Sequence, residues 1–267
     1  MSLQNKCKVS IITVVYNGGK TIEDTILSVD SQDYPLKEHI VIDGASTDNT
    51  LSIVTKHRSK ITRFVSEPDN GIYDAMNKGI DLATGDVIGI LNADDIYYGT
   101  NCISSVVHEF KSKQVEAVCG DLVYVLPDNL DRIVRYYSSE GFHPDKFAYG
   151  IMPAHPAFFV DRYCYEKYGL FKTDYMIAAD FELLARFLRT NRVRYYCLPQ
   201  VLVKMRTGGI STRNLKSNWI LNREIVKACR ENNIKTNILK IYSKYIFKAL
   251  QFIRRPDPVI ELQDQLK

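Results

Sequence analysis

The chain has 267 residues, of which 45% are hydrophobic and 25% are charged. These proportions are ordinary for a globular protein, and they exclude collagen-like, low-complexity and intrinsically disordered classes. The formal net charge of +4 is too small to indicate a nucleic-acid partner. A chain of this length buries a sizeable core without a disulfide or a structural metal, and it fits one large domain with an appendage.

The charge is distributed unevenly along the chain. From Lys204 to Arg255 there are 13 Lys and Arg against 2 Glu, a net charge of +11, whereas residues 1–203 carry 21 basic and 26 acidic residues, a net charge of −5. Within 237–255, Lys240, Lys244 and Lys248 recur every four residues, with apolar residues mainly on the other side. This pattern fits a helix on an anionic membrane surface, and it equally fits a helix packed on the body with solvated lysines.

The six cysteines are scattered, without C-x-x-C pairs or zinc spacing, which favours a reducing compartment. The sequence contains no apolar run of the length that spans a membrane. The apolar run Val9–Val15 is too short, and too closely flanked by polar residues, for a signal peptide. We therefore expect a cytoplasmic protein, either soluble or peripheral at the inner face of the membrane.

Short apolar runs alternate with helical patterns over the first 115 residues. The patterns predict strands at 8–16, 39–43, 61–66 and 87–91, and helices at 21–31, 48–57, 72–83 and 101–111. Ser46 or Thr47 is placed to cap the second of these helices. Such alternation predicts a mostly parallel sheet covered by helices on both faces, with ligands beyond the carboxyl ends of the strands.

The alternation fades after residue 115. The patterns predict an antiparallel hairpin of 117–125 with 132–137, strands at 158–160 and 194–204, and helices at 163–168 and 179–190. The remainder of the chain, after the strand at 194–204, is predicted to be helical to residue 255. The segment 204–211 contains Gly208 and Gly209 and is interpreted as a mobile loop.

Polar side chains stand where the predicted strands end. Asp94 and Asp95 follow the fourth strand, and such a pair suits a divalent cation with oxygen ligands, although a polar turn explains it equally well. Asp43 and Tyr16 end the second and first strands, where a carboxylate accepts the N–H of a base and an aromatic ring stacks on it. A turn aspartate and a core tyrosine are the alternatives. The sequence has no dinucleotide-binding glycine motif after the first strand and no P-loop motif, which disfavours both of those sites.

Five segments resemble, in order, the motifs of family 2 glycosyltransferases, an inverting group with the GT-A fold. They are Thr13–Asn17 (TVVYN), Val41–Asp48 (VIDGASTD), Glu67–Gly79 (EPDNGIYDAMNKG), Leu91–Asp95 (LNADD) and Ala178–Leu184 (AADFELL). Each motif is weak by itself, but the five occur in the expected order and spacing, and the resemblance extends over roughly residues 7–215. The resemblance implies an α/β sheet of the GT-A type. It implies a nucleoside-diphosphate sugar as donor, with uridine as the default base and guanosine open, and a glycan or lipid-linked acceptor in bacterial cell-surface polysaccharide biosynthesis.

The resemblance also implies roles for individual residues. The implied nucleotide-binding residues are Thr13, Tyr16, Asp43, Gly71, Asn92 and Asp94. Asp94 and Asp95 would bind Mn²⁺ or Mg²⁺, and Asp180 would be the general base. His155 and Arg206 are candidates on the acceptor or diphosphate side.

Three departures from the family pattern stand out. Asn92 occupies the usual place of an aspartate that contacts the ribose, and an amide still hydrogen-bonds a hydroxyl. Ala179 stands where an acidic residue often precedes the base, which leaves Asp180 as the one carboxylate of that motif. The histidine that often binds the metal in the region of 204–211 is absent, so a third protein ligand is not identified.

These assignments define a chemistry and a domain plan. A divalent cation at Asp94 neutralises the departing diphosphate, while Asp180 takes the proton of an attacking hydroxyl in one inverting displacement. We expect a catalytic domain at 1–215, with a nucleotide-binding half at 1–115 and an acceptor-binding half at 116–215, followed by a basic helical extension at 216–267. The alternative functions are a sugar-phosphate nucleotidyltransferase and a non-catalytic sugar-nucleotide-binding or membrane-surface protein.

Overall fold

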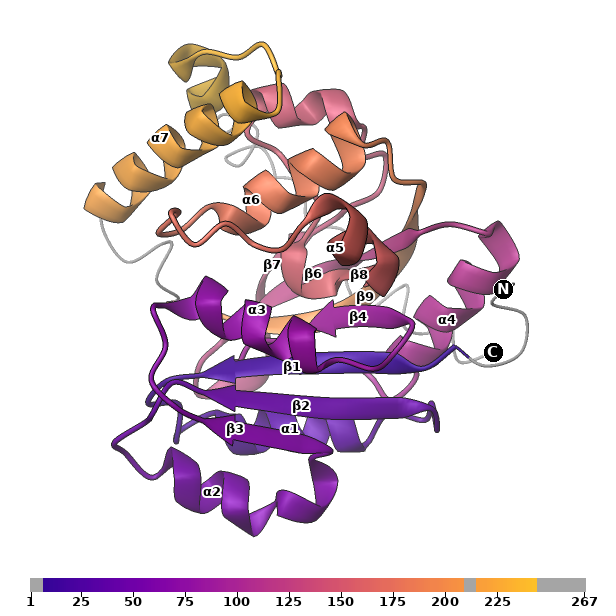
Figure 1. The fold of residues 1–267 in the computed structure, drawn as a ribbon, viewed down its shortest axis with the longest axis vertical. Helices are drawn as coiled ribbons and strands as arrows, with labels where there is room; N and C mark the ends of the chain where they lie inside the picture. Colours follow the sequence, from indigo (N-terminus) through magenta and orange to yellow (C-terminus); the bar gives the residue numbers. More distant parts are fainter. Residues whose placement is uncertain (1–6, 209–214, 244–267) are drawn as a thin grey trace.

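Nine strands form one sheet in the computed structural model, which describes residues 7–208 and 215–243 (Figure 1). The strands are β1 Val9–Val15, β2 Lys37–Asp43, β3 Arg63–Ser66, β4 Val87–Ile90, β5 Asp95–Tyr97, β6 Ala117–Leu126, β7 Asn129–Tyr137, β8 Phe158–Asp161 and β9 Tyr195–Arg206. Their order across the sheet is β3-β2-β1-β4-β8-β6-β9-β5, and β7 pairs with β6 beside that path.

Helices cover the sheet. They are α1 Ile22–Asp30, α2 Thr50–Lys56, α3 Ile72–Leu82, α4 Cys102–Lys113, α5 Arg162–Tyr168, α6 Ala179–Leu184 and α7 Leu215–Glu231. Four short non-α helical segments join them: η1 Arg58–Lys60, η2 Pro144–Tyr149, η3 His155–Ala157 and the π-helix η4 Ala185–Thr190, which continues α6. No helix in these parts of the chain is both long and apolar enough to cross a membrane.

The first half of the sheet is parallel, as the alternation of apolar runs predicts. β1 lies between β2 and β4 and is parallel to both, and β2 is parallel to β3. Because side chains alternate across a strand, Ile12 and Val14 pack in the core that holds α3, whereas Val15 and Val41 pack in the core that holds α1 and α2. Burial on both faces explains why β1 and the centre of β2 are mostly apolar.

The second half of the sheet is mixed. β8 is antiparallel to β4 and to β6, β6 is parallel to β9, and the hairpin partners β6 and β7 are antiparallel, as predicted. The short strand β5, which pairs antiparallel with the end of β9, was not predicted. Together these pairings give the mixed α/β sheet of the expected GT-A type.

Three local predictions were wrong. The side chain of Ser46 accepts the Asn17 N–H, while Asp48 accepts the N–H of Thr50 in the first turn of α2, so neither Ser46 nor Thr47 caps that helix. Residues 204–206 belong to β9 rather than to a loop, and 209–211 lie outside the described residues. The helical structure after α7 is interrupted, because residues 232–237 are non-helical and Asn233 has a φ of 55°.

Helix α7 is packed on the body. It contacts α6, and its apolar face contributes Ile225, Ala228 and Cys229 to the core cluster that also contains Phe181 and Leu184. In Figure 1, α7 lies alongside α6 on the far side of the sheet from α2. A second helical stretch begins at Ile238 and is described to residue 243, so it contains Lys240 of the predicted basic stripe, whereas Lys244 and Lys248 lie outside the described residues.

Candidate active site

The carboxyl ends of β1, β2 and β3 bring polar groups to one edge of the sheet. Val15 pairs with Asp43, and Asp43 pairs with Ser66, so these three residues stand in one row. The Asp43 side chain is buried, and its Oδ2 accepts hydrogen bonds from Ser66 Oγ at 2.7 Å and from the Ser46 N–H at 3.0 Å. Its Oδ1 has no hydrogen-bond partner in the described part of the chain. Asp43 therefore keeps one oriented acceptor for a donor from a ligand.

Tyr16 lies beside this row with 66% of its surface exposed. Between them, Gly44 allows a close approach, because a Cβ at that position would lie 2.4 Å from Asp69 Oδ2 and 3.5 Å from the Tyr16 ring. Asp69 Oδ1 accepts the N–H of Gly71 at 2.9 Å, and Gly71 has a φ of 112°, a conformation that favours glycine. Tyr16, Asp69 and Gly71 thus form an exposed surface with aromatic and polar groups near the start of α3.

Thr13 lies inside the sheet rather than at its edge. It is fully buried, and its hydroxyl is 3.0 Å from Nε2 of His39 on the neighbouring strand. Burial lowers the pKa of His39 to about 3, so the imidazole is neutral. The two side chains stabilise the β1–β2 pair behind the candidate nucleotide site.

Asn92, Asp94 and Asp95 form an acidic turn after β4. Asp95 has no exposed surface, and neither of its carboxylate oxygens has a hydrogen-bond partner among the described residues. Burial raises the pKa of Asp95 well above its usual value, and the charge of Asp94 raises it further. Asp94 is partly exposed, and the Oδ1 of Asn92 is buried without a partner in the described chain. Several side-chain oxygen atoms of this turn therefore receive no hydrogen bond from the described part of the chain.

Arg206 occupies the end of β9 and holds this turn in place. Its Nη1 donates to the main-chain oxygen of Asp94 at 2.7 Å, and its Nη2 forms an ion pair with Asp24 of α1. Only 6% of the residue is exposed. Thr25 reinforces the turn, because its hydroxyl is 2.7 Å from the main-chain oxygen of Asp95. In this conformation Arg206 positions the acidic turn, and its two terminal nitrogens are engaged within the protein.

Oxygen donors of this kind match a hard divalent cation. In residues 7–208 and 215–243, no three or more His, Cys, Asp or Glu side chains are arranged to hold a metal ion. Asp94 with the unpartnered oxygens of Asn92 and Asp95 nevertheless fits Mg²⁺ or Mn²⁺, since such ions use one or two carboxylates and complete their coordination with phosphate oxygens and water.

Asp180 lies in the first turn of α6, on the other half of the sheet. Burial raises its pKa to about 6, although its Oδ1 accepts the Phe181 N–H at 2.7 Å, and this bond favours the ionised form. The charge of Asp180 in turn raises the pKa of Tyr73 of α3 and that of Tyr137 of β7, although burial is the larger cause for both tyrosines. A partly exposed carboxylate with a pKa near neutrality suits a general base.

His155 belongs to an aromatic wall beside this group. It is 7% exposed, and its ring stands edge-on to Phe171 at 5.7 Å, while Phe171 stacks on Tyr73 at 5.8 Å. Burial lowers the pKa of His155 to about 4, so the ring is neutral. The described contacts give it a packing role near the Tyr73 segment.

Several site residues were missed from the sequence. Ser66 orients Asp43, Asp24 and Thr25 fix the acidic turn, and Glu224 of α7 binds the segment before Asp180. Ser66 is the one with a usable signal, because it ends a predicted parallel strand next to the strand of Asp43. The others depend on contacts between elements that are distant in sequence.

Comparisons with known proteins identify the family of the chain. The family model described as Glycosyl transferase family 2 matches residues 10–166. An uncharacterized glycosyltransferase of Mycobacterium tuberculosis is 33% identical over 184 residues, covering 67% of this chain and 68% of the relative. A PGL/p-HBAD biosynthesis glycosyltransferase of the same organism is 28% identical over 222 residues, covering 82% of each chain.

Solved structures share the fold. A TarS fragment of S. aureus in complex with UDP-GlcNAc superposes with a TM-score of 0.62 at 18% identity, covering 83% of this chain and 66% of that one. A mannosyltransferase from Pyrobaculum calidifontis in complex with GDP-Man and Mn²⁺ gives a TM-score of 0.63 at 22% identity, covering 85% and 64%. The chain therefore spans about two thirds of the length of these structures.

Proposed function

The chain belongs to glycosyl transferase family 2 and is a glycosyltransferase, and from this premise we propose its reaction. It moves a sugar from a nucleoside-diphosphate sugar to a hydroxyl group of a glycan or lipid-linked acceptor, in polysaccharide biosynthesis, with inversion at the anomeric carbon. The PGL/p-HBAD biosynthesis relative supports a glycan or lipid-linked acceptor.

Asp180 carries the proposal. With a pKa of about 6, this carboxylate is roughly 90% ionised at pH 7, and it is still basic enough to accept a proton. It removes the proton from the acceptor hydroxyl as that oxygen attacks the anomeric carbon, and the diphosphate leaves from the opposite side. The single base supports one displacement, and hence inversion.

The donor nucleotide is proposed to bind at the β1–β2–β3 edge. Asp43 Oδ1 accepts an N–H of the base, and the exposed ring of Tyr16 stacks on it. Uridine is the first choice and guanosine the second, since the related structures hold UDP-GlcNAc and GDP-Man respectively. Asn92 and Gly71 are proposed to contact the ribose and diphosphate, and Thr13 supports the base pocket from inside the sheet.

Asp94 is proposed to hold Mn²⁺ or Mg²⁺, with Asp95 and Asn92 next to it. When bound, the ion neutralises the charge that develops on the departing diphosphate. Arg206 keeps the turn in place through the main-chain oxygen of Asp94, so its proposed contribution to the diphosphate side is indirect.

A binding panel tests the donor site. Calorimetry with UDP, GDP, ADP and CDP, each with and without Mn²⁺, should give one preferred base and tighter binding with the ion. Asp43→Asn should weaken the preferred nucleotide at least about tenfold, because it replaces one acceptor by a donor. Asp33→Asn, on the surface, is the matched control. Binding of no nucleoside diphosphate, or equal binding by the Asp43 variant, contradicts the proposal.

A stereochemical assay tests the reaction. Wild-type protein with Mn²⁺ is given UDP-GlcNAc or GDP-mannose, with water as the acceptor, and proton NMR follows the anomer that forms first. The β-anomer from an α-linked donor supports single displacement, whereas the α-anomer refutes it. Asp180→Asn should slow turnover by about 10²–10⁴-fold, and equal turnover would show that Asp180 is not the base.

Peripheral membrane contact is a separate proposal on the C-terminal region. Ile238, Leu239 and Tyr242 are 46%, 78% and 45% exposed, and Lys240 lies 5.7 Å from the ring centre of Tyr149, itself 42% exposed. Apolar side chains interleaved with lysine suit an anionic bilayer surface. Removing the residues after Asn233 should abolish co-sedimentation with phosphatidylglycerol vesicles; unchanged binding, or equal binding to phosphatidylcholine vesicles, refutes the contact.

A further inference from the structure

A carboxylate from α7 binds the segment that leads into Asp180. Glu224 Oε1 accepts the N–H of Met176 at 2.7 Å, and Oε2 accepts the N–H groups of Ile177 and Ala178, both at 2.9 Å. Hydrogen bonds from neutral donors to an ionised carboxylate are short and roughly twice as strong as those between neutral groups. Asp180 follows two residues after Ala178, so the backbone that directs the Asp180 side chain is held by a residue of another helix.

The same segment is held from its other side by α3. The Tyr73 hydroxyl donates to the main-chain oxygen of Ile177, so Ile177 is bound through both of its main-chain groups. Ala178 is the N-cap of α6 and has no side chain that can accept from the first turn. A negative charge near a helix N-terminus is favourable. Glu224, which belongs to a different helix, therefore supplies the negative charge near the N-terminus of α6 that an acidic N-cap side chain would otherwise supply.

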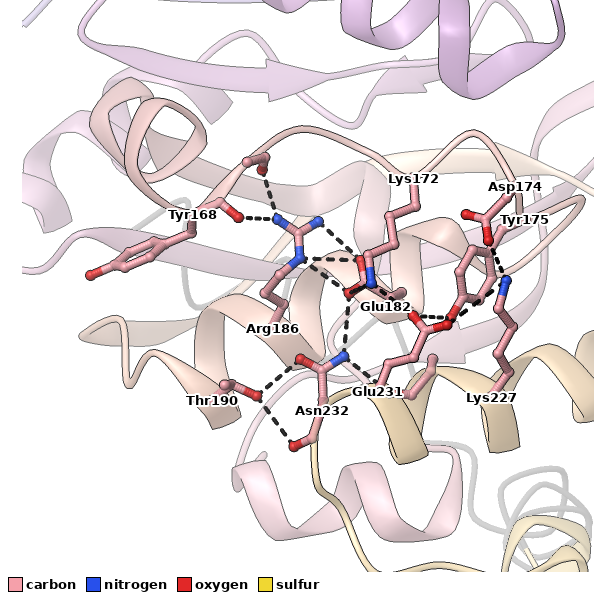
Figure 2. A network of polar contacts seen from close by, with 12 residues as sticks. Tyr168, Lys172, Asp174, Tyr175, Glu182, Arg186, Thr190, Lys227, Glu231 and Asn232 are labelled. Carbon is pink, nitrogen blue, oxygen red and sulfur yellow. Dashed lines mark hydrogen bonds and ion pairs between the residues drawn. The ribbon is translucent and has the colours of Figure 1, made fainter.

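A buried polar network fixes the position of α7 on α6 (Figure 2). Glu182 of α6 is fully buried and accepts from Arg186 at 2.9 Å and from Lys172 at 3.1 Å. Lys172 also binds Glu231 of α7 at 2.7 Å, and Asn232 donates to Glu182 at 3.3 Å. This network binds the end of α7 to α6. Glu224 lies two helical turns before Glu231 on α7, so the network also holds Glu224 in place relative to Met176–Ala178.

We propose that Glu224 is a positioning residue for the reaction: it fixes the direction of the Asp180 carboxylate and keeps a second negative charge beside it. The proposal rests on the proposed function, in which Asp180 is the base. Glu224 does not contact substrate in this account; it acts through the main chain of residues 176–178. A misplaced base loses rate even when it is chemically intact.

The charge of Glu224 gives the proposal a second readout. The titratable groups whose pKa is coupled to Asp180 are Glu224 from α7, Tyr73 from α3 and Tyr137 from β7, and the Arg135 guanidinium lies 5.6 Å from the centre of the Tyr137 ring. Burial is the main cause of the raised pKa of Asp180, and Glu224 adds to it. Removing the Glu224 charge should therefore lower the pKa of Asp180 by part of its elevation, leaving it above the ordinary aspartate value.

Three variants of the full chain separate these effects. Glu224→Gln removes the charge and keeps the size, and Glu224→Asp keeps the charge but shortens the reach. Glu231→Gln is the matched control, because it removes a charge from the same helix while its amide oxygen can still accept from Lys172 and Tyr175, and Asn232 still donates to Glu182. Each variant is measured by hydrogen exchange of the amides of 176–178, by carbon-13 NMR titration of the Asp180 carboxyl, and by hydrolysis of UDP-GlcNAc and GDP-mannose with Mn²⁺.

The expected results differ between the variants. Glu224→Gln loses amide protection at 176–178, titrates Asp180 at lower pH, and lowers kcat by about 10–100-fold with the donor KM within about threefold. Glu224→Asp lowers kcat while the Asp180 titration stays near that of the wild type. Glu231→Gln matches the wild type in all three measurements, so the loss of a negative charge from α7 does not by itself explain the result.

Two outcomes overturn the proposal. One is an Asp180 titration and an amide protection in Glu224→Gln that equal those of the wild type; the other is a Glu231→Gln variant with the same losses as Glu224→Gln. The hydrogen exchange of the amides of 176–178 and the NMR titration of Asp180 are both measured without catalytic turnover. If the wild type binds no nucleoside diphosphate, the proposed function fails, while these two measurements still decide whether Glu224 positions Asp180.

Discussion

Replacing Asp180 by Asn should remove activity and raise stability together. The carboxylate lies in a desolvated site, and burial raises its pKa to about 6 from an ordinary value of 3.8. A carboxylic group whose pKa is raised by folding destabilises the folded protein when it is ionised. Asparagine removes that charge, and its Oδ1 still accepts the Phe181 N–H that Asp180 accepts at 2.7 Å.

The magnitude follows from the difference between the two pKa values. About two units correspond to at most about 3 kcal/mol of unfolding free energy, at about 1.4 kcal/mol per unit. The sign also follows: the destabilisation is absent below the unfolded value of 3.8, grows as the pH rises to about 6, and is constant above that. In a chain of this size, such a gain raises the Tm by roughly 5–10 °C at pH 8.

Thermal unfolding of the wild type and Asp180→Asn, measured from pH 4 to pH 8, tests this reasoning. The Tm difference should be small at pH 4, widen through pH 6 and then stay level, while turnover by the variant falls as described above. An asparagine variant that is less stable at pH 8, or a Tm difference that does not change with pH, would show that Asp180 is not a desolvated carboxylate. In the wild type, activity should fall as the pH drops below about 6, because the base becomes protonated.

Three further predictions concern buried charged side chains. Arg206→Met should cost about 2–3 kcal/mol in urea unfolding, since the bond to the Asp94 main chain is lost, and a cost within error of zero would contradict this. Glu182→Gln should cost about 1.5–3 kcal/mol because the buried carboxylate loses its charge-assisted bonds with Arg186 and Lys172, while Lys227→Met, which breaks an exposed pair, should cost under about 1 kcal/mol; equal costs would refute the distinction. Burial alone would raise the pKa of Glu38, yet its hydrogen bonds hold it at about 2, so its stabilisation is lost as the pH falls from about 4.5 to 2. Glu38→Gln should flatten the acid unfolding curve in that window, and an unchanged curve would show that other carboxylates control it.

The parallel half of the sheet was predictable because its signal is local. β1 and β4 are short, mostly apolar runs buried on both faces, β2 contains the buried run Ile40–Ile42, and β3 is a partly exposed edge strand; a helix separates each strand from the next. The carboxyl ends of parallel strands share an edge, so Asp43 and Tyr16 were expected together, and Ser66 stands in the same row as Asp43. For this edge of the sheet, the sequence pattern and the observed strand register place the same residues together.

The contacts of the acidic turn were not predictable in the same way. β5 has three residues and begins with the buried Asp95, and it exists because it pairs with Met205–Val203 of β9, more than a hundred residues later. Arg206 precedes two glycines in the sequence, which suggested a loop, yet its guanidinium is buried against Asp24. Pairing between elements distant in the chain leaves no periodic signal in either one.

The uneven charge of the chain acquires a structural explanation from these contacts. Arg206, near the start of the basic region, lies against the acidic turn, and its charge lowers the pKa of Asp95 that burial and Asp94 raise. The two acidic residues between Lys204 and Arg255 are Glu224 and Glu231, and both face the body: Glu224 binds the segment before Asp180, and Glu231 binds Lys172.

A boundary after residue 215 would therefore pass through interactions that support the proposed base. Ile225, Ala228 and Cys229 of α7 lie in the same apolar cluster as Phe181 of α6, and α7 supplies the Glu224 carboxylate. A chain shortened before α7 would expose that cluster and leave the N–H groups of 176–178 without their acceptor. The basic region thus has two parts, since α7 packs on the half of the sheet that carries Asp180, whereas the exposed apolar residues Ile238, Leu239 and Tyr242 follow the break at 232–237.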